Sequence, residues 1–360
     1  MKVSFIINEP IQSASGGYKM VYIYANELVN RGHDVTIYYH CHRGVLLSNY
    51  YIPFWMKMIM ANILAKTGPK WFELDQRVGR KVVQDVTDKN VSDGDIVIAT
   101  AANTAGEVFL LDKNKGKKAY FVQGYEDWVM SKEELENTYR LDMEIITVSK
   151  WLQTIIQNVV DSDRVNCVLN GIRNDVFYII NSPETRSIKM ISMLYHDLES
   201  KGSKEGIYVL NELKKLFPDL KAHLFGVVDN PGNLPSWIDY THNADQNQLR
   251  KIYNDSMIYL SPSWNEGFGL TGAEAMMCGA VLVSTKTDGV KEYSTEENAF
   301  WVDVHDTKSM IDKCVEVITK PELRNRMAIA GSKYVAEKLC YEKSVDGFIG
   351  ILERMHKGRD

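Results

Sequence analysis

Residues 261–280 read SPSWNEGFGLTGAEAMMCGA and join a glycine-bearing loop to the start of a short helix. The apolar run at 257–260 predicts a buried strand before the loop, and 280–284 predicts the next strand. Gly279 is expected to end the helix, since glycine readily adopts the left-handed conformation found at helix ends. The order strand, loop, helix, strand is that of a parallel sheet, which binds ligands at the carboxyl ends of its strands. The sequence therefore predicts a binding site in this loop.

Two carboxylates flank the turn, with Glu266 in the loop and Glu274 inside the expected helix. A helix N-terminus carries unpaired N–H groups and partial positive charge, so it attracts phosphate. Carboxylates beside it can accept hydrogen bonds from sugar hydroxyls. A site that binds phosphate and also has two carboxylates for sugar hydroxyls would suit a nucleotide sugar. The alternative is an ordinary glycine-rich loop with two solvated glutamates, which shows the same sequence pattern. The glycines would let a ligand approach the backbone of Phe268, Gly269, Leu270 and Thr271.

The pattern S-P-S-x-x-E-G-F-G-L-x-x-x-E-A-x-x-C-G-A, which contains Glu266 and Glu274, resembles the E-x7-E signature of retaining glycosyltransferases of the glycosyltransferase 4 family. The resemblance implies an α/β fold of the GT-B type, with two Rossmann-like domains facing across a cleft and a C-terminal helix crossing back to the first domain. We expect an acceptor domain at 1–180, a nucleotide-sugar domain at 186–338 and the returning helix at 339–360.

The N-terminal segment predicts a βαβ unit, with strands at 2–8 and 33–40, a loop ending in Gly16-Gly17 and a helix at 18–30. The resemblance implies that Gly16 and Gly17 form the glycine loop that closes over the donor phosphates near the acceptor; a simple tight turn is the alternative. A nicotinamide-dependent dehydrogenase is disfavoured because G-x-G-x-x-G is absent and the second strand ends without a ribose-binding acid.

Two positions depart from the family's pattern. Gln123 stands where the family usually has a histidine close to the donor sugar and acceptor. The segment 195–202 resembles G-R-x-x-x-x-K-G, whose arginine and lysine grip the diphosphate; here Lys201 matches the lysine and His196 replaces the arginine. Histidine lacks the bidentate fork of arginine and is only partly charged near neutrality. The alternative is that Lys201 and His196 are ordinary loop residues.

The remaining apolar runs predict more of the same alternation. Strands are expected at 95–100, 118–123, 145–149, 164–169, 189–195 and 222–227, and helices from residue 151 and at 207–216, 246–254 and 341–355.

Composition excludes several classes of protein. A formal net charge of −5 argues against nucleic-acid binding, which favours a basic surface. The five cysteines are scattered and lack the spacing of metal ligands, which indicates a reducing compartment. No signal peptide or transmembrane helix is predicted, so we expect a cytoplasmic protein. Two D-x-D matches, at 93–95 and 161–163, precede strands and are interpreted as turns, so no metal is expected.

The segment 50–72 is basic and apolar, since no Asp or Glu occurs between Asp34 and Glu73 while Trp, Phe, Met and Lys recur. This composition suits a helix lying on an anionic membrane, which would place the protein at the inner face of the membrane near a lipid-linked acceptor. A buried helix or a lid over the acceptor pocket is the alternative.

The resemblance implies a retaining enzyme that moves a hexosyl or deoxyhexosyl group from a nucleotide diphosphate sugar to a glycan or lipid-linked acceptor, in cell-surface polysaccharide synthesis. Glu266 and Lys201 are the expected catalytic residues, with Glu266 contacting donor-sugar hydroxyls and Lys201 the diphosphate. Glu274 would hold the ribose hydroxyls. The alternatives are a nucleotide-sugar epimerase of similar fold and a catalytically weak protein that binds sugar nucleotides or a partner.

Overall fold

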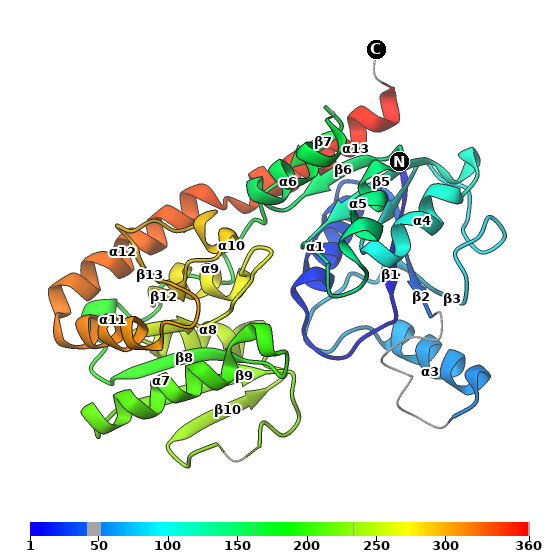
Figure 1. Ribbon diagram of the computed structural model, residues 1–360. Coiled ribbons are helices and arrows are strands. Elements are labelled where there is room, and N and C mark those ends of the chain that lie inside the picture. The colour runs from blue at the N-terminus through cyan, green and yellow to red at the C-terminus, as the bar shows by residue number, and fades with distance from the viewer. Residues whose placement is uncertain (42–51, 162, 233, 359–360) are drawn as a thin grey trace. The chain divides into compact units, whose positions relative to one another are not determined.

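The protein forms two compact units in a computed structural model that describes residues 1–41, 52–161, 163–232 and 234–358. Unit 1 comprises residues 1–169 and 343–360, and unit 2 comprises residues 170–342. Each unit is built on a parallel sheet packed against helices (Figure 1). The alternation of apolar strands and helices in the sequence therefore gives the expected α/β architecture twice.

Unit 1 contains a parallel sheet of seven strands in the order β3-β2-β1-β4-β5-β6-β7. All four residues of β4 are buried, because a central strand of a parallel sheet is covered on both faces. The strands are β1 (Lys2–Asn8), β2 (Asp34–His40), β3 (Gly79–Val83), β4 (Ile96–Ala99), β5 (Lys117–Val122), β6 (Glu144–Thr147) and β7 (Val165–Cys167). The helices between them are α1 (Gly16–Asn30), α3 (Phe54–Thr67), α4 (Ala102–Leu110), α5 (Lys132–Arg140) and α6 (Lys150–Val160).

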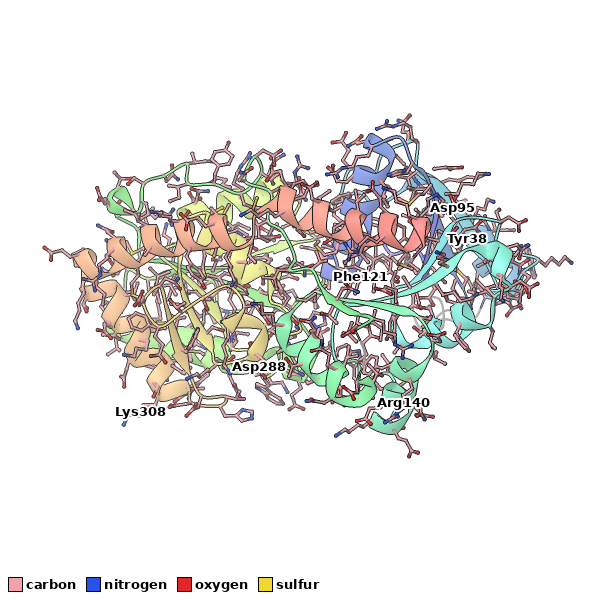
Figure 2. All side chains as sticks on the ribbon, turned by 90° about the horizontal axis from the view of Figure 1, so that it is seen from above. Tyr38, Asp95, Phe121, Arg140, Asp288 and Lys308 are labelled. Carbon is pink, nitrogen blue, oxygen red and sulfur yellow. The ribbon has the colours of Figure 1, made fainter. Side chains whose placement is uncertain are left out.

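The last helix, α13 (Tyr341–Lys357), packs against the sheet and α1 of unit 1. The Phe348 ring stacks on Tyr24, with centroids 3.9 Å apart, and meets Phe121 edge-on at 5.3 Å. Phe121 is labelled in Figure 2, beside the red ribbon of α13. The Ser344 hydroxyl lies 3.0 Å from the Tyr24 hydroxyl and donates to the Leu169 carbonyl over 2.7 Å. The returning helix thus completes the aromatic core of unit 1.

Unit 2 contains a parallel sheet of six strands in the order β10-β9-β8-β11-β12-β13. Strand β11 pairs with β8 through Leu260 and Met193, so the loops that follow these two strands are neighbours. The strands are β8 (Met190–Tyr195), β9 (Lys221–Gly226), β10 (Ile238–His242), β11 (Ile258–Ser261), β12 (Val281–Thr285) and β13 (Ala299–Val302). The helices are α7 (Ser203–Leu216), α8 (Gln246–Asp255), α9 (Leu270–Met277), α10 (Asp288–Lys291), α11 (Thr307–Thr319) and α12 (Pro321–Lys338).

A buried arginine joins the ends of two of these helices. The Arg186 guanidinium donates to the carbonyl of Ser256 after α8, and to those of Cys278 and Gly279 after α9, the last over 2.9 Å. Burial lowers the pKa of Arg186 to about 10. A cation at a helix C-terminus interacts favourably with the negative end of the helix dipole. Arg186 therefore stabilises the C-terminal end of α9, the helix that carries Glu274.

The structure corrects several element boundaries and adds elements that sequence periodicity missed. Helix α1 begins at Gly16 rather than Tyr18, so the glycine pair forms the first helical turn and not a loop. Helix α7 begins at Ser203 rather than residue 207. The unpredicted strands β3, β10 and β13 all lie at sheet edges, where one side is free of strand pairing and the apolar run is weaker.

Candidate active site

The two predicted catalytic side chains meet at the carboxyl edge of the unit 2 sheet. Lys201 ends a short 3-10 turn (Glu199–Lys201) after β8, and Glu266 lies in the loop after β11. Lys201 Nζ lies 2.9 Å from Glu266 Oε2, although the residues are 65 positions apart. The Lys201 and Glu266 side chains are 25% and 13% exposed, so the pair is shielded but accessible. An amine and a carboxylate therefore share one site beside the N-terminus of α9.

The backbone locks the two loops together. The Trp264 N–H donates to the Ser200 carbonyl over 2.7 Å. Gly202 has a φ of 65°, and a Cβ there would lie 2.1 Å from the Pro262 carbonyl oxygen. A side chain at position 202 would strain the backbone and clash with Pro262. Glycine at this position therefore allows the turn that carries Lys201 to pack directly against the loop that carries Glu266.

Tyr293 packs against the loop that carries Glu266. Gly269 is the N-cap residue just before α9 and has a φ of 88°, and a Cβ on it would lie 2.9 Å from the Tyr293 hydroxyl. The Phe268 ring packs on Tyr293 with centroids 5.6 Å apart and is itself buried. Burial first, and then the charge of Glu266, raise the pKa of Tyr293. Phe268 therefore belongs to the core, and only its backbone could face a ligand.

The start of α9 places the other predicted donor contacts. Leu270 and Thr271 form its first two positions, where backbone N–H groups have no partner within the helix. The Thr271 hydroxyl accepts a hydrogen bond from Tyr259 over 2.7 Å, which fixes its orientation. Glu274 lies one turn on and is only 2% exposed. Its charge acts on Tyr253, whose pKa is raised by burial and by Glu274. Glu274 is thus much less accessible than Glu266.

His196 follows β8 directly and shares the turn with Lys201. Its backbone N–H donates to the Ser203 hydroxyl over 2.8 Å, and its Nδ1 accepts the Leu198 N–H over 3.0 Å. Burial and the positive charge of Lys201 lower the pKa of His196. The His196 side chain therefore lies in the same turn as Lys201, and the hydrogen bond from Leu198 fixes the orientation of its ring.

The remaining predicted residues, Gly16, Gly17 and Gln123, belong to unit 1. Gln123 follows β5, and its Nε2 would lie 3.4 Å from a Cβ on Gly17. The structure therefore brings Gly17 and Gln123 together at the carboxyl ends of β1 and β5. A larger residue at position 17 would press on the glutamine amide.

Sequence spacing missed a cluster that braces the glutamate loop. The Trp264 indole N–H donates to Glu205 over 3.3 Å, and His305 Nδ1 lies 2.7 Å from the other Glu205 oxygen. The Trp264 and His305 rings meet edge-on at 4.6 Å. Glu205 and His305 are 100 positions apart, so no local pattern connects them. Only Trp264, two residues before Glu266, could have been singled out from the motif.

Two further predictions concern metals and membranes. Across residues 1–41, 52–161, 163–232 and 234–358, no group of three or more His, Cys, Asp or Glu side chains is arranged to hold a metal ion. Within the same ranges, no helix has the length and apolarity needed to cross a bilayer.

Comparison with known proteins gives a family match for the segment that contains the predicted site residues of unit 2. Residues 189–334, which include Lys201, Glu266 and Glu274, match the family described as "Glycosyl transferases group 1". The family resemblance deduced from the sequence is confirmed for this segment.

Relatives of this group 1 segment include a D-inositol 3-phosphate glycosyltransferase of Saccharomonospora viridis, which is 28% identical over 104 residues covering 29% of this chain and 24% of that protein. An N-acetyl-alpha-D-glucosaminyl L-malate synthase of Bacillus anthracis is 29% identical over 150 residues, covering 39% of each chain. This chain therefore spans well under half the length of these relatives.

Solved structures extend the likeness in fold to nearly the whole chain. A sucrose-phosphate synthase from Thermosynechococcus elongatus has a TM-score of 0.75 at 13% identity and covers 99% of both chains. Anabaena HepE in complex with UDP-glucose has a TM-score of 0.74 at 13% identity, covering 98% of this chain and 99% of that one. The predicted GT-B fold class, with two Rossmann-like α/β domains, is confirmed.

Proposed function

We propose that the protein is a retaining glycosyltransferase that moves a hexosyl or deoxyhexosyl group from a nucleotide diphosphate sugar to a glycan or lipid-linked acceptor. The observation that carries the proposal is the contact between Lys201 and Glu266 in a group 1 segment, beside a helix N-terminus. That arrangement offers one cation for phosphate and one carboxylate for sugar hydroxyls within a single partly shielded site.

In the proposed reaction, the bond from sugar C1 to the departing phosphate oxygen breaks while a bond from C1 to the acceptor oxygen forms on the same face. The acceptor proton passes to the departing phosphate oxygen, so no protein base is required. Lys201 stabilises the charge on the diphosphate, and Glu266 binds donor-sugar hydroxyls beside the oxocarbenium-like centre. The backbone of Phe268–Thr271 would bind sugar and phosphate, Glu274 the ribose, and Gly16, Gly17 and Gln123 the side nearer the acceptor.

Several similar proteins support this substrate class. Anabaena HepE was solved with UDP-glucose, and Staphylococcus aureus TarM with UDP and alpha-GlcNAc-glycerol. The chain is also similar to a serotype-specific mannosyltransferase, WbdA of Escherichia coli, at 25% identity over 142 residues. We propose that the protein acts in cell-surface polysaccharide synthesis. No metal is assigned a role in the proposed reaction.

A thermal-shift panel of UDP-, GDP-, ADP- and dTDP-sugars tests the proposal. A donor at about one hundred times its Kd should stabilise the protein by about 2.7 kcal/mol and raise Tm by several degrees. The stabilising donor is then incubated with candidate glycan and lipid-linked acceptors, and the anomeric configuration of the product is read by NMR. Inversion at C1 would contradict the retaining mechanism. A free isomerised sugar nucleotide would indicate an epimerase, and binding without turnover a sugar-nucleotide-binding protein.

We also propose that α3 contacts an anionic membrane surface at its cytoplasmic face. Only Ala61 and Ala65 of this apolar helix are buried, while Trp55 is 63% and Ile63 56% exposed. Met56, Ile59 and Met60 are also exposed on this helix. The segment from 52 to 72 contains lysines but no Asp or Glu, which complements anionic lipid; residues 50–51 of the predicted segment lie outside the described residues. Aromatic and aliphatic residues beside lysines are typical of interfacial helices.

Sedimentation with vesicles tests the membrane contact. We expect binding to vesicles that contain anionic lipid at low salt, and at least a tenfold loss when Trp55 and Ile59 are both replaced by serine, since two exposed apolar anchors are removed. A matched variant, Leu216→Ser, removes an exposed leucine from α7 and should leave binding unchanged. Failure of the wild-type protein to bind such vesicles would rule out the contact.

A further inference from the structure

The backbone on both sides of His196 fixes its position. The Ser203 hydroxyl accepts the His196 N–H and donates to the His196 carbonyl, each over 2.8 Å. Ser203 is the first residue of α7, so the turn from β8 to α7 is closed by two reciprocal hydrogen bonds. His196 and Lys201 stand at the two ends of this turn. The ring of His196 is therefore presented from the same loop as the ammonium of Lys201.

The hydrogen bond to Nδ1 determines the tautomer of His196. The Leu198 backbone N–H can only donate, and it lies 3.0 Å from Nδ1. Nδ1 must then accept and carries no proton, which leaves the neutral ring with its proton on Nε2. Within residues 1–41, 52–161, 163–232 and 234–358, no protein atom is hydrogen-bonded to Nε2. The free N–H of a neutral imidazole is thus available to a ligand.

The surroundings favour the same neutral form. Burial and the charge of Lys201 lower the pKa of His196, while the carboxylates of Asp197 and Glu266 act in the opposite direction. Glu266 is itself paired with Lys201, which weakens its pull on the ring. Protonation would also place a second positive charge beside Lys201 and break the hydrogen bond from Leu198.

Resting on the proposed function, we propose that His196 binds the donor diphosphate as a neutral N–H donor through Nε2. Positive charge in this turn is then supplied by Lys201, where the family pattern has an arginine and a lysine together. A neutral donor can replace one hydrogen bond of an arginine fork but not its charge. The hydrogen bond to the phosphate oxygen is expected to matter, whereas the charge state of the ring should not.

Three substitutions separate hydrogen bonding from charge. The glutamine side chain of His196→Gln places a neutral amide N–H about as far from the backbone as Nε2. The side chain of His196→Asn is shorter, so its amide N–H does not reach this position. His196→Ala has no donor. The nucleoside diphosphate that gives the largest thermal shift among UDP, GDP, ADP and dTDP serves as the probe, and its Kd is measured by calorimetry. We expect His196→Gln to stay within about threefold of wild type, and His196→Asn and His196→Ala to lose about tenfold to a hundredfold. Equal losses for Gln and Ala would overturn the proposal.

A pH series gives a second readout. The phosphates titrate identically in both complexes, so the ratio of Kd values for wild type and His196→Gln reports the imidazole alone. We expect this ratio to stay constant from pH 8.5 to pH 6. A ratio that increasingly favours wild type as the pH falls would show that the imidazolium binds, and would overturn the proposal while leaving the proposed function intact. A wild-type protein that binds none of the four nucleotides would overturn both.

Discussion

Replacing Lys201 by methionine is expected to lower the rate constant for glycosyl transfer by about 10²–10³ at saturating donor and acceptor. Negative charge grows on the departing phosphate oxygen as the glycosidic bond breaks, so a fixed ammonium stabilises the transition state more than the ground state. Lys201 is suited to this because Glu266 holds its ammonium at 2.9 Å in a site where only 25% of the side chain is exposed. Initial rates of product formation, measured by chromatography, provide the test.

A neighbouring lysine provides the matched control. Lys204 is exposed on α7, forms no ion pair in the described part of the chain, and should tolerate methionine with little change in rate. Glu266→Gln should also lower the rate strongly while donor binding persists. Because Lys201 and Glu266 touch, the loss in the double variant should be smaller than the product of the single losses. A Lys201→Met variant that keeps more than about a third of the wild-type rate would contradict the role of the ammonium.

Replacing Arg186 by methionine is expected to destabilise the folded protein by about 3 kcal/mol. The change leaves the carbonyl oxygens of Ser256, Cys278 and Gly279 without their donor inside the protein. Each buried acceptor left unpaired costs about 1–3 kcal/mol, and part of this is recovered because the guanidinium no longer has to be desolvated. Thermal unfolding should show Tm lower by roughly 6–12 °C.

Two control variants distinguish the loss of the Arg186 hydrogen bonds from the loss of side-chain size or charge. Arg326 is exposed on α12, and Arg326→Met should change Tm by no more than a degree or two. Arg186→Lys keeps a cation but reaches fewer carbonyls, so its Tm should lie between those of Arg186→Met and wild type. Wild-type stability in Arg186→Met would mean that the helix ends are satisfied without the guanidinium.

The sequence predicted the centres of the two sheets well because their strands are covered on both faces. Runs such as 2–8 and 189–195 are mostly apolar, and the structure places β1 at the predicted bounds and β8 one residue later at its start. The edge strand β10 is half polar and pairs on one side, so it lacks the continuous apolar run that identifies a buried strand. The start of α1 was misjudged because glycine favours loops, yet the first helical turn tolerates it.

The candidate site was predictable where chemistry is concentrated in one motif. Glu266, Glu274 and the backbone between them were identified together because a short segment contains them all. The contact between Lys201 and Glu266 required the pairing of β8 with β11, which links distant segments. The Glu205–His305 pair had no signal, since the two residues are 100 positions apart and neither belongs to a motif.

The return of α13 to unit 1 has a consequence for how the protein is made. Phe348 and Ser344 complete the core around Tyr24, but the ribosome reaches them only after all of residues 170–342. Unit 2 is one continuous stretch and can fold as it emerges, whereas unit 1 must wait with an aromatic surface uncovered. Nascent chains that stall within unit 2 should therefore expose the apolar surface of unit 1 that α13 normally covers. We expect such chains to be prone to aggregation and to depend on chaperones.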